Sequence, residues 1–120
     1  MTLPLKYDAR AAKSELAAVE EPLAQALLEG RHEIRRQVAC GRGRADIFDE
    51  TTGELIECKA RGDAESIGAA VDQLKRYRPY FYDPQLAVAV PCIEPDARWL
   101  IAALQQQGIR IIEMSKGIGI

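Results

Sequence analysis

Two acidic residues and a lysine in the middle of the chain form the pattern most able to do chemistry. Asp46 lies before, and Glu57 and Lys59 lie after, a Glu-Thr-Thr-Gly stretch at residues 50–53 that is typical of a hairpin loop. If that stretch is the loop, Asp46 and Glu57 face each other on neighbouring strands, with Cβ atoms roughly 4.5–5.5 Å apart. Two opposed carboxylates repel each other unless a cation or a shared proton joins them.

A divalent metal ion is the cation that suits this pair best. Carboxylate oxygens are hard ligands, and Mg²⁺ takes one or two of them while it keeps waters and substrate phosphate oxygens. Alternate side chains of a strand share a face, so Lys59 lies beside Glu57 and Cys58 points the other way. Lys59 could then neutralise charge on a phosphate or orient a metal-bound water. The alternative is a surface hairpin whose charged side chains face water and bind no metal.

Helical segments on both sides of the hairpin carry further polar candidates. In the Ala- and Leu-rich stretch 10–29, Glu20 falls within the leucine stripe, where a carboxylate requires a partner. If Pro22 breaks that helix, Glu20 is instead a loop or cap residue. After the hairpin, Gln73 and Tyr77 share one helix face beside an apolar stripe, for which a polar flank is the ordinary interpretation.

The elements that must position these side chains follow the order αβββαβαβ. After the first helix, which Gly30 ends, residues 32–40 alternate and predict a strand with Ile34, Val38 and Cys40 on one side. The elements that follow are strands at 44–49 and 54–60, a helix at 63–78, a buried strand at 86–90, a helix from Pro95 to Gly108 and a strand at 109–112. We expect one α/β domain over residues 1–120, with one mixed central sheet flanked by helices.

Composition excludes several classes of protein. With 48% apolar and 28% charged residues and a net charge of −2, the chain is neither disordered nor fibrous. Three widely spaced cysteines and one histidine exclude a disulfide framework and an ordinary zinc site, and they favour the reducing cytoplasm. No apolar run approaches the roughly 20 residues of a membrane span. Ten of the 16 Lys and Arg residues lie between residues 31 and 78, where acidic residues nearly balance them.

These motifs together resemble the PD-(D/E)xK nuclease superfamily. The matches are Asp46 at the first acidic position, Glu57-Cys58-Lys59 at (D/E)xK, Gln73 to Tyr77 at the QxxxY motif of RecB-type nucleases, and Glu20 or its neighbour Glu21 at the first-helix glutamate of many members. From about residue 20 to residue 113, the chain is most similar to the C-terminal nuclease domain of NucS/EndoMS mismatch endonucleases. Archaeal Holliday-junction resolvases are similar in size and strand order.

The resemblance implies a restriction-endonuclease-like αβββαβ core with an added αβ, and metal-dependent hydrolysis of DNA phosphodiester bonds. Asp46, Glu57 and the Cys58 carbonyl would hold Mg²⁺, for which Mn²⁺ could substitute, and Glu20 would contribute through water. Lys59 would position or activate the attacking water, and Gln73 would support the site. The candidates for contact with DNA are Arg42, Arg44, Arg61, Arg76 and Tyr77.

We therefore expect a Mg²⁺-dependent deoxyribonuclease, and we favour a structure-specific endonuclease of DNA repair, recombination or mobile-element processing. Because 120 residues present little surface to DNA, we expect a homodimer or a partner protein that supplies specificity. Tyr80, Phe81 and Tyr82 are candidates for the dimer interface, unless they pack beneath the following strand. The competing hypothesis is a catalytically inactive DNA- or protein-binding module on the same fold.

Overall fold

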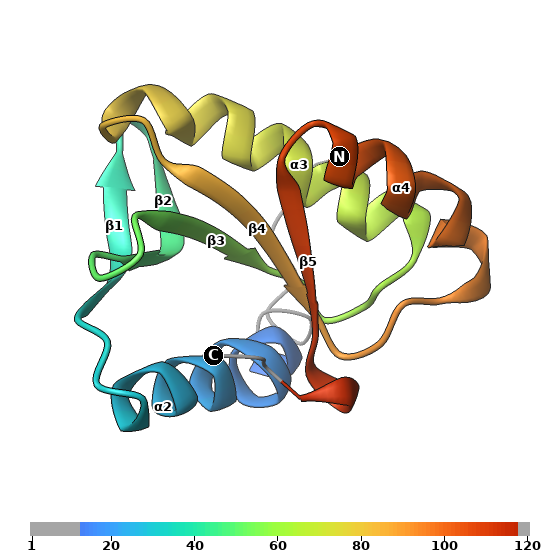
Figure 1. The fold of residues 1–120 in the computed structure, drawn as a ribbon, viewed down its shortest axis with the longest axis horizontal. Helices are drawn as coiled ribbons and strands as arrows, with labels where there is room; N and C mark the ends of the chain where they lie inside the picture. The colour runs from blue at the N-terminus through green and yellow to red at the C-terminus, as the bar shows by residue number, and fades with distance from the viewer. Residues whose placement is uncertain (1–12, 118–120) are drawn as a thin grey trace, which may run out of the picture.

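The computed structural model describes residues 13–117, which form a five-stranded mixed sheet with helices on both faces (Figure 1). The spatial order of the strands is their order in the sequence: β1 (Ile34–Cys40), β2 (Gly43–Asp49), β3 (Glu54–Cys58), β4 (Gln85–Val90) and β5 (Ile109–Glu113). The first three strands are antiparallel, whereas β4 and β5 run parallel to β3. The predicted α/β fold with a mixed central sheet is confirmed.

Helices cover the two faces of the sheet and enclose a separate apolar core on each. The helical elements are the π-helical turn η1 (Leu16–Glu20), α2 (Glu21–Glu29), α3 (Ala64–Tyr77), α4 (Arg98–Gln106), and the short 3-10 turns η2 (Arg78–Tyr80), η3 (Pro95–Ala97) and η4 (Met114–Lys116). Leucines and a valine of η1 and α2 pack on one face, and the apolar stripe of α3 packs on the other. None of the helices within residues 13–117 is long and apolar enough to cross a membrane.

Local sequence signals set the C-terminal end of α2, both ends of α3 and the hairpin loop as the sequence predicted. β1 begins at Ile34 rather than at residue 32, and β3 ends at Cys58 rather than at residue 60. The Asp63 side chain accepts a hydrogen bond from the Ser66 N–H and caps α3, and Gly30 ends α2. In the hairpin loop at residues 50–53, Asp49 accepts from the N–H groups of the two threonines, and Gly53 adopts a positive φ of 76°. The predicted loop is therefore confirmed, and the strands on either side of it pair in register, with Phe48 opposite Leu55.

The prediction that Ile34, Val38 and Cys40 lie on one side of β1 is wrong. Midway along β1 and β2, the side chains of each strand change to the other face of the sheet. Ile34 packs against the α2 side, whereas Val38 and Cys40 pack against the α3 side. The strands pair regularly on both sides of Gln37 and Asp46, but these two residues are not a ladder pair, and Gln37 has a positive φ of 51°. That backbone turns the strand over, so the alternation in the sequence does not continue through it.

Tyr77 of α3 packs against Gly43 of β2, and this contact yields a stability prediction. A Cβ at Gly43 would lie 2.4 Å from the Tyr77 hydroxyl oxygen and 2.9 Å from its ring. Gly43→Ala should therefore lower the free energy of unfolding by about 1–3 kcal/mol, the scale of an overpacked core. Gly68→Ala is the matched control, because open space surrounds Gly68 in α3; it should stabilise by about 0.5–1 kcal/mol. Urea unfolding followed by circular dichroism measures both, and equal stabilities would contradict the packing.

Candidate active site at the hairpin

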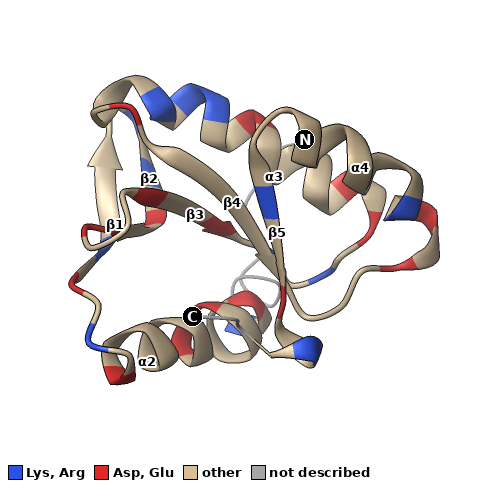
Figure 2. Ribbon diagram, in the orientation of Figure 1, with Lys and Arg blue, Asp and Glu red and all other residues tan. Residues whose placement is uncertain are grey.

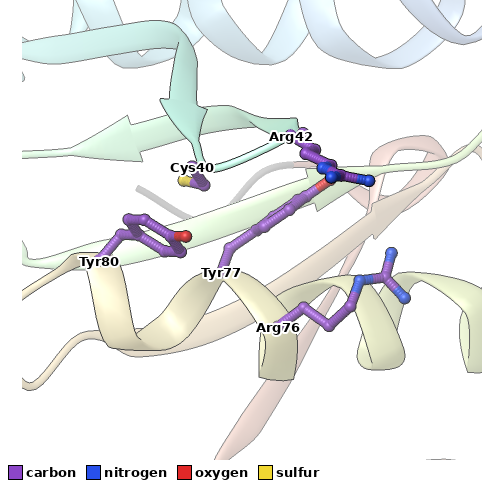
Figure 3. A pocket seen from close by; sticks show the side chains of 6 residues that line it. Cys40, Arg42, Arg76, Tyr77 and Tyr80 are labelled. Carbon is purple, nitrogen blue, oxygen red and sulfur yellow. The ribbon is translucent and has the colours of Figure 1, made fainter.

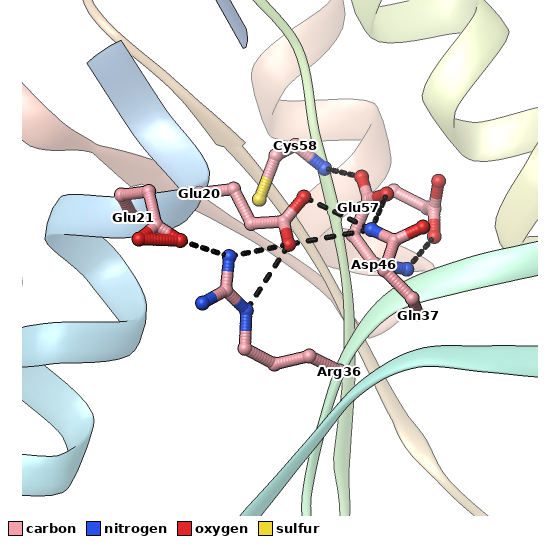
Figure 4. A network of polar contacts seen from close by, with 7 residues as sticks. All are labelled: Glu20, Glu21, Arg36, Gln37, Asp46, Glu57 and Cys58. Atoms are coloured by element: carbon pink, nitrogen blue, oxygen red, sulfur yellow. Dashed lines mark hydrogen bonds and ion pairs between the residues drawn. The ribbon is translucent and has the colours of Figure 1, made fainter. Parts of the chain in front are cut away.

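Asp46 and Glu57 are each held to the opposite strand of the β2–β3 hairpin by a hydrogen bond from its backbone (Figure 4). The Asp46 N–H donates to Glu57 Oε2 at 2.9 Å, and the Cys58 N–H donates to Asp46 Oδ2 at 2.8 Å. The regular ladder ends one step earlier, at Ile47 and Ile56, so side chains replace the backbone acceptors here. The structure thus brings together the two carboxylates that the hairpin register pairs.

Both carboxylates are buried, and their pKa values rise as a result. Asp46 is 9% exposed and Glu57 is 2% exposed. Burial raises the pKa of Glu57 far above its usual range, and the charge of Asp46 raises it further. Burial also raises the pKa of Asp46, although the bond from the Cys58 N–H opposes that rise. At neutral pH the pair therefore holds a proton or requires a nearby cation.

Glu20 is buried as predicted, but its carboxylate is already engaged by side chains of β1. Arg36 Nη2 donates to Glu20 Oε2 at 2.8 Å, and Gln37 Nε2 donates to Glu20 Oε1 at 3.1 Å. The same Gln37 nitrogen lies 3.3 Å from Asp46 Oδ1, which links Glu20 to the hairpin pair. Glu21 is exposed and also contacts Arg36. These contacts suit Glu20 to fixing Asp46 in place rather than to binding an ion.

Glu15 is a functional candidate that the sequence reasoning missed. It lines a pocket of about 480 Å³ together with Glu20, Asp46 and four neighbours. Burial raises its pKa to about 7, with smaller contributions from the charges of Asp46 and Glu20. The π-helical turn places Glu15 there, because the Glu21 N–H donates to the Leu16 carbonyl five residues back and widens the helix. The regular helical spacing used for sequence reasoning gives no signal of this turn.

Lys59 lies close enough to the acidic group to act on all of it. Its charge lowers the pKa of Glu15, Asp46 and Glu57, in each case against the larger effect of burial. Its backbone is fixed at the end of β3, because the Lys59 N–H donates to the Ala89 carbonyl of β4 at 2.9 Å. The strand end therefore places Lys59 near enough for its charge to act on all three carboxyl groups, although it forms no ion pair within 4.0 Å among the described residues.

The remaining predicted residues do not gather at one place. Arg42, Arg76 and Tyr77 line a second pocket on the α3 side. Arg61 lies apart from it, in an ion pair with Glu94 at 2.9 Å. Arg44 is exposed on β2, and the Gln73 amide oxygen is buried without a hydrogen-bond partner among the described residues. Basic positions gather along the C-terminal part of α3 and the turn after it (Figure 2).

The donor chemistry of the hairpin pair fits a hard divalent cation. Within residues 13–117, no three His, Cys, Asp or Glu side chains form a ready-made metal centre. Mg²⁺ does not require one, because it binds through one or two carboxylates and completes its shell with waters and phosphate oxygens. Asp46 and Glu57 can supply those carboxylates because neither forms an ion pair among the described residues, whereas Glu20 is paired with Arg36 at 2.8 Å.

Comparison with protein families, curated proteins and solved structures found no significant match to this chain. Folds alone do not establish functions, so the function has to be argued from the chemistry of this site. That chemistry comprises a buried carboxylate pair, a third carboxyl group beside it, and one lysine.

The raised pKa values predict how stability depends on pH. Glu15, Asp46 and Glu57 all have pKa values above their ordinary values of 4.5, 3.8 and 4.5, so the folded protein holds protons that the unfolded chain releases. In EDTA, the free energy of unfolding should therefore fall as the pH rises above those values. Glu57→Gln should flatten this decline, whereas Glu33→Gln on the surface should not. Urea unfolding across this pH range measures it, and a wild-type slope in Glu57→Gln would contradict the assignment.

Proposed function

We propose that this protein is a metal-dependent deoxyribonuclease of the PD-(D/E)xK type, and that it acts as an endonuclease. The observation that carries the proposal is that Asp46 and Glu57 each accept a hydrogen bond from the opposite strand of the hairpin, within reach of the charge of Lys59. Two like charges that are buried together reduce the stability of the fold. Backbone hydrogen bonds that hold both carboxylates in place are therefore best explained by a functional role for the pair. Hydrolysis of a phosphodiester is the reaction that combines carboxylates, a divalent cation and a lysine.

Each residue of the site has a role in this reaction. Asp46, Glu57 and the Cys58 carbonyl would hold Mg²⁺, with Mn²⁺ as a substitute. When bound, the ion would polarise a phosphoryl oxygen and lower the pKa of a bound water. Lys59 orients that water and offsets the negative charge that develops on the phosphate. Glu15, with a pKa of about 7, can accept or return a proton near neutral pH.

The expected substrate and setting follow from the same proposal. DNA is the substrate, with a structural preference such as a flap or junction, in repair, recombination or mobile-element processing. A homodimer or a partner protein would extend the limited DNA-binding surface. Phe81 packs against Phe48 in the core, whereas Tyr80 and Tyr82 are exposed, so only these two remain available to an interface. The three free cysteines fit the reducing cytoplasm.

One observation favours a second candidate, an inactive DNA- or protein-binding module on this fold. Glu20 is paired with Arg36 at 2.8 Å, so this carboxylate is already balanced by a cation of the protein. Such a module would bind DNA or protein without metal and would cleave nothing. Closed circular DNA incubated with Mg²⁺ or Mn²⁺ separates the candidates, because only an endonuclease opens it.

Lys59→Ala tests the catalytic assignment. Lys59 acts on charge that develops in the transition state, so its loss should lower the single-turnover cleavage rate by about 10²-fold or more. The fold and metal binding should survive, because an ammonium group is not a metal ligand. Lys116→Ala, which removes an exposed lysine remote in sequence, should cleave at the wild-type rate. Wild-type cleavage by folded Lys59→Ala would exclude a catalytic role for this lysine.

Metal binding can be tested without any DNA. Mn²⁺ should raise the thermal midpoint of the wild-type protein in a concentration-dependent way, because an ion that binds only the folded state stabilises it by mass action. Asp46→Asn should lose this response, and Asp83→Asn, which changes a carboxylate in the loop before β4, should keep it. A wild-type midpoint that saturating Mn²⁺ leaves unchanged would argue against the metal site.

A further inference from the structure

A second pocket, of about 450 Å³, lies on the α3 side of the sheet, where the turn between β1 and β2 meets the C-terminal end of α3 (Figure 3). Its lining comprises Cys40, Arg42, Gly43, Arg76, Tyr77 and Tyr80. The pocket thus combines two aromatic rings with two guanidinium groups. The hairpin carboxylates are not part of its lining, so its chemistry differs from that of the acidic pocket.

Gly41 in the turn and Gly43 at the start of β2 leave room for the two tyrosine hydroxyl groups to pack closely against the backbone. A Cβ at Gly41 would lie 2.5 Å from the Tyr80 hydroxyl oxygen, and Gly43 receives Tyr77 in the same way. Gly41 also has a positive φ of 63°, which side chains rarely allow. The Tyr77 ring is buried, whereas Tyr80 is 58% exposed at the mouth of the pocket. The turn therefore presets both rings before any ligand arrives.

The two arginines of the pocket are available to an anion. Among the described residues, neither Arg42 nor Arg76 has a carboxylate within 4.0 Å, whereas Arg36, Arg61 and Arg110 are all paired. The Arg76 guanidinium lies 5.9 Å from the centre of the Tyr77 ring, which orients it by a cation–π contact. Unpaired arginines beside aromatic rings suit a ligand with both a phosphate and a flat ring.

A nucleotide has this combination, and its base must be unpaired to stack on a tyrosine ring. Bases stack on tyrosine faces and phosphates accept hydrogen bonds from arginine, but a base within a duplex exposes no face for stacking. The pocket volume lies within the range of small-ligand sites, about 300–1,000 Å³. Double-stranded DNA could reach the arginines alone, so the aromatic walls indicate a strand whose bases are free.

The pocket is near the hairpin carboxylates. Gly43 lies three residues before Asp46 on β2, a separation of roughly 10 Å at the rise of a strand. Cys40 of the pocket lies close enough to Glu57 for that charge to raise the pKa of its thiol, after the larger effect of burial. A nucleotide in the pocket would therefore lie close to a phosphate bound at Asp46.

We infer that this pocket binds an unpaired nucleotide of the DNA strand beside the phosphate to be cleaved, and thereby selects single-stranded, flapped or overhanging DNA over a continuous duplex. The inference rests on the proposed nuclease function for the identity of the strand. It adds Tyr80 as a residue that determines specificity, together with Arg42, Arg76 and Tyr77.

Binding in EDTA tests the pocket separately from cleavage. Fluorescence anisotropy would compare a short labelled oligothymidylate with a fully paired hairpin duplex on the full chain. The wild-type protein should prefer the oligothymidylate. Tyr80→Ala should weaken that binding by about tenfold or more, the scale of one lost stacking contact, and Tyr80→Phe should retain it. Trp99→Ala is the matched control, because Trp99 of α4 is 75% exposed and lies outside the pocket lining.

The outcomes distinguish this inference from the proposed function. Oligothymidylate binding that depends on Tyr80, with no cleavage of any DNA in Mg²⁺, would support the pocket and overturn the nuclease. If the wild-type protein cleaves DNA but folded Tyr80→Ala binds oligothymidylate as tightly as the wild type, the pocket would be overturned and the nuclease would stand. Absence of oligothymidylate binding by the wild-type protein, or a preference for duplex, would also overturn the inference.

Discussion

The arrangement of the site depends on one constraint, the confinement of two carboxylates between neighbouring strands. Asp46 and Glu57 each accept a hydrogen bond from the backbone of the opposite strand, so neither can turn away to relieve repulsion. Their burial raises the pKa of both carboxyl groups, so the pair holds a proton unless a cation lies nearby. Lys59, Glu15 and the Arg36–Glu20–Gln37 network all lie around this pair and adjust its charge.

At Gln37 and Asp46, the side chains of β1 and β2 change from one face of the sheet to the other, and this change connects the acidic site to the second pocket. Before the reversal β1 contributes Ile34 to the α2 side, and after it Val38 and Cys40 pack on the α3 side. Asp46 lies at the crossing point, where Gln37 reaches it from the Glu20 side. β2 thus contributes Gly43 to the arginine and tyrosine pocket and Asp46 to the acidic pocket.

Much of the fold could be predicted because the residues that begin and end its elements act through local contacts. Gly30 and Asp63 end or begin helices through their own backbone or side chain, and the four loop residues fix the hairpin register that brings Asp46 to Glu57. Two features depend on contacts distant in sequence. The positive φ of Gln37 changes the face on which the side chains of β1 lie, and no glycine signals this in the sequence. The π-helical turn brings Glu15 to the same side as Glu20, which regular helical spacing does not predict. The pairing of Arg36 with Glu20 likewise follows from tertiary packing.

The carbon NMR signals of the Asp46 and Glu57 carboxyl groups, followed against pH with and without Mg²⁺, test the central claim most directly. Without metal, Glu57 should titrate far above its ordinary value of 4.5 and Asp46 above 3.8. Saturating Mg²⁺ should move both midpoints down to or below those values, because a bound cation favours the charged forms. Titration curves that superimpose with and without Mg²⁺ would contradict the assignment of this carboxylate pair as a metal site.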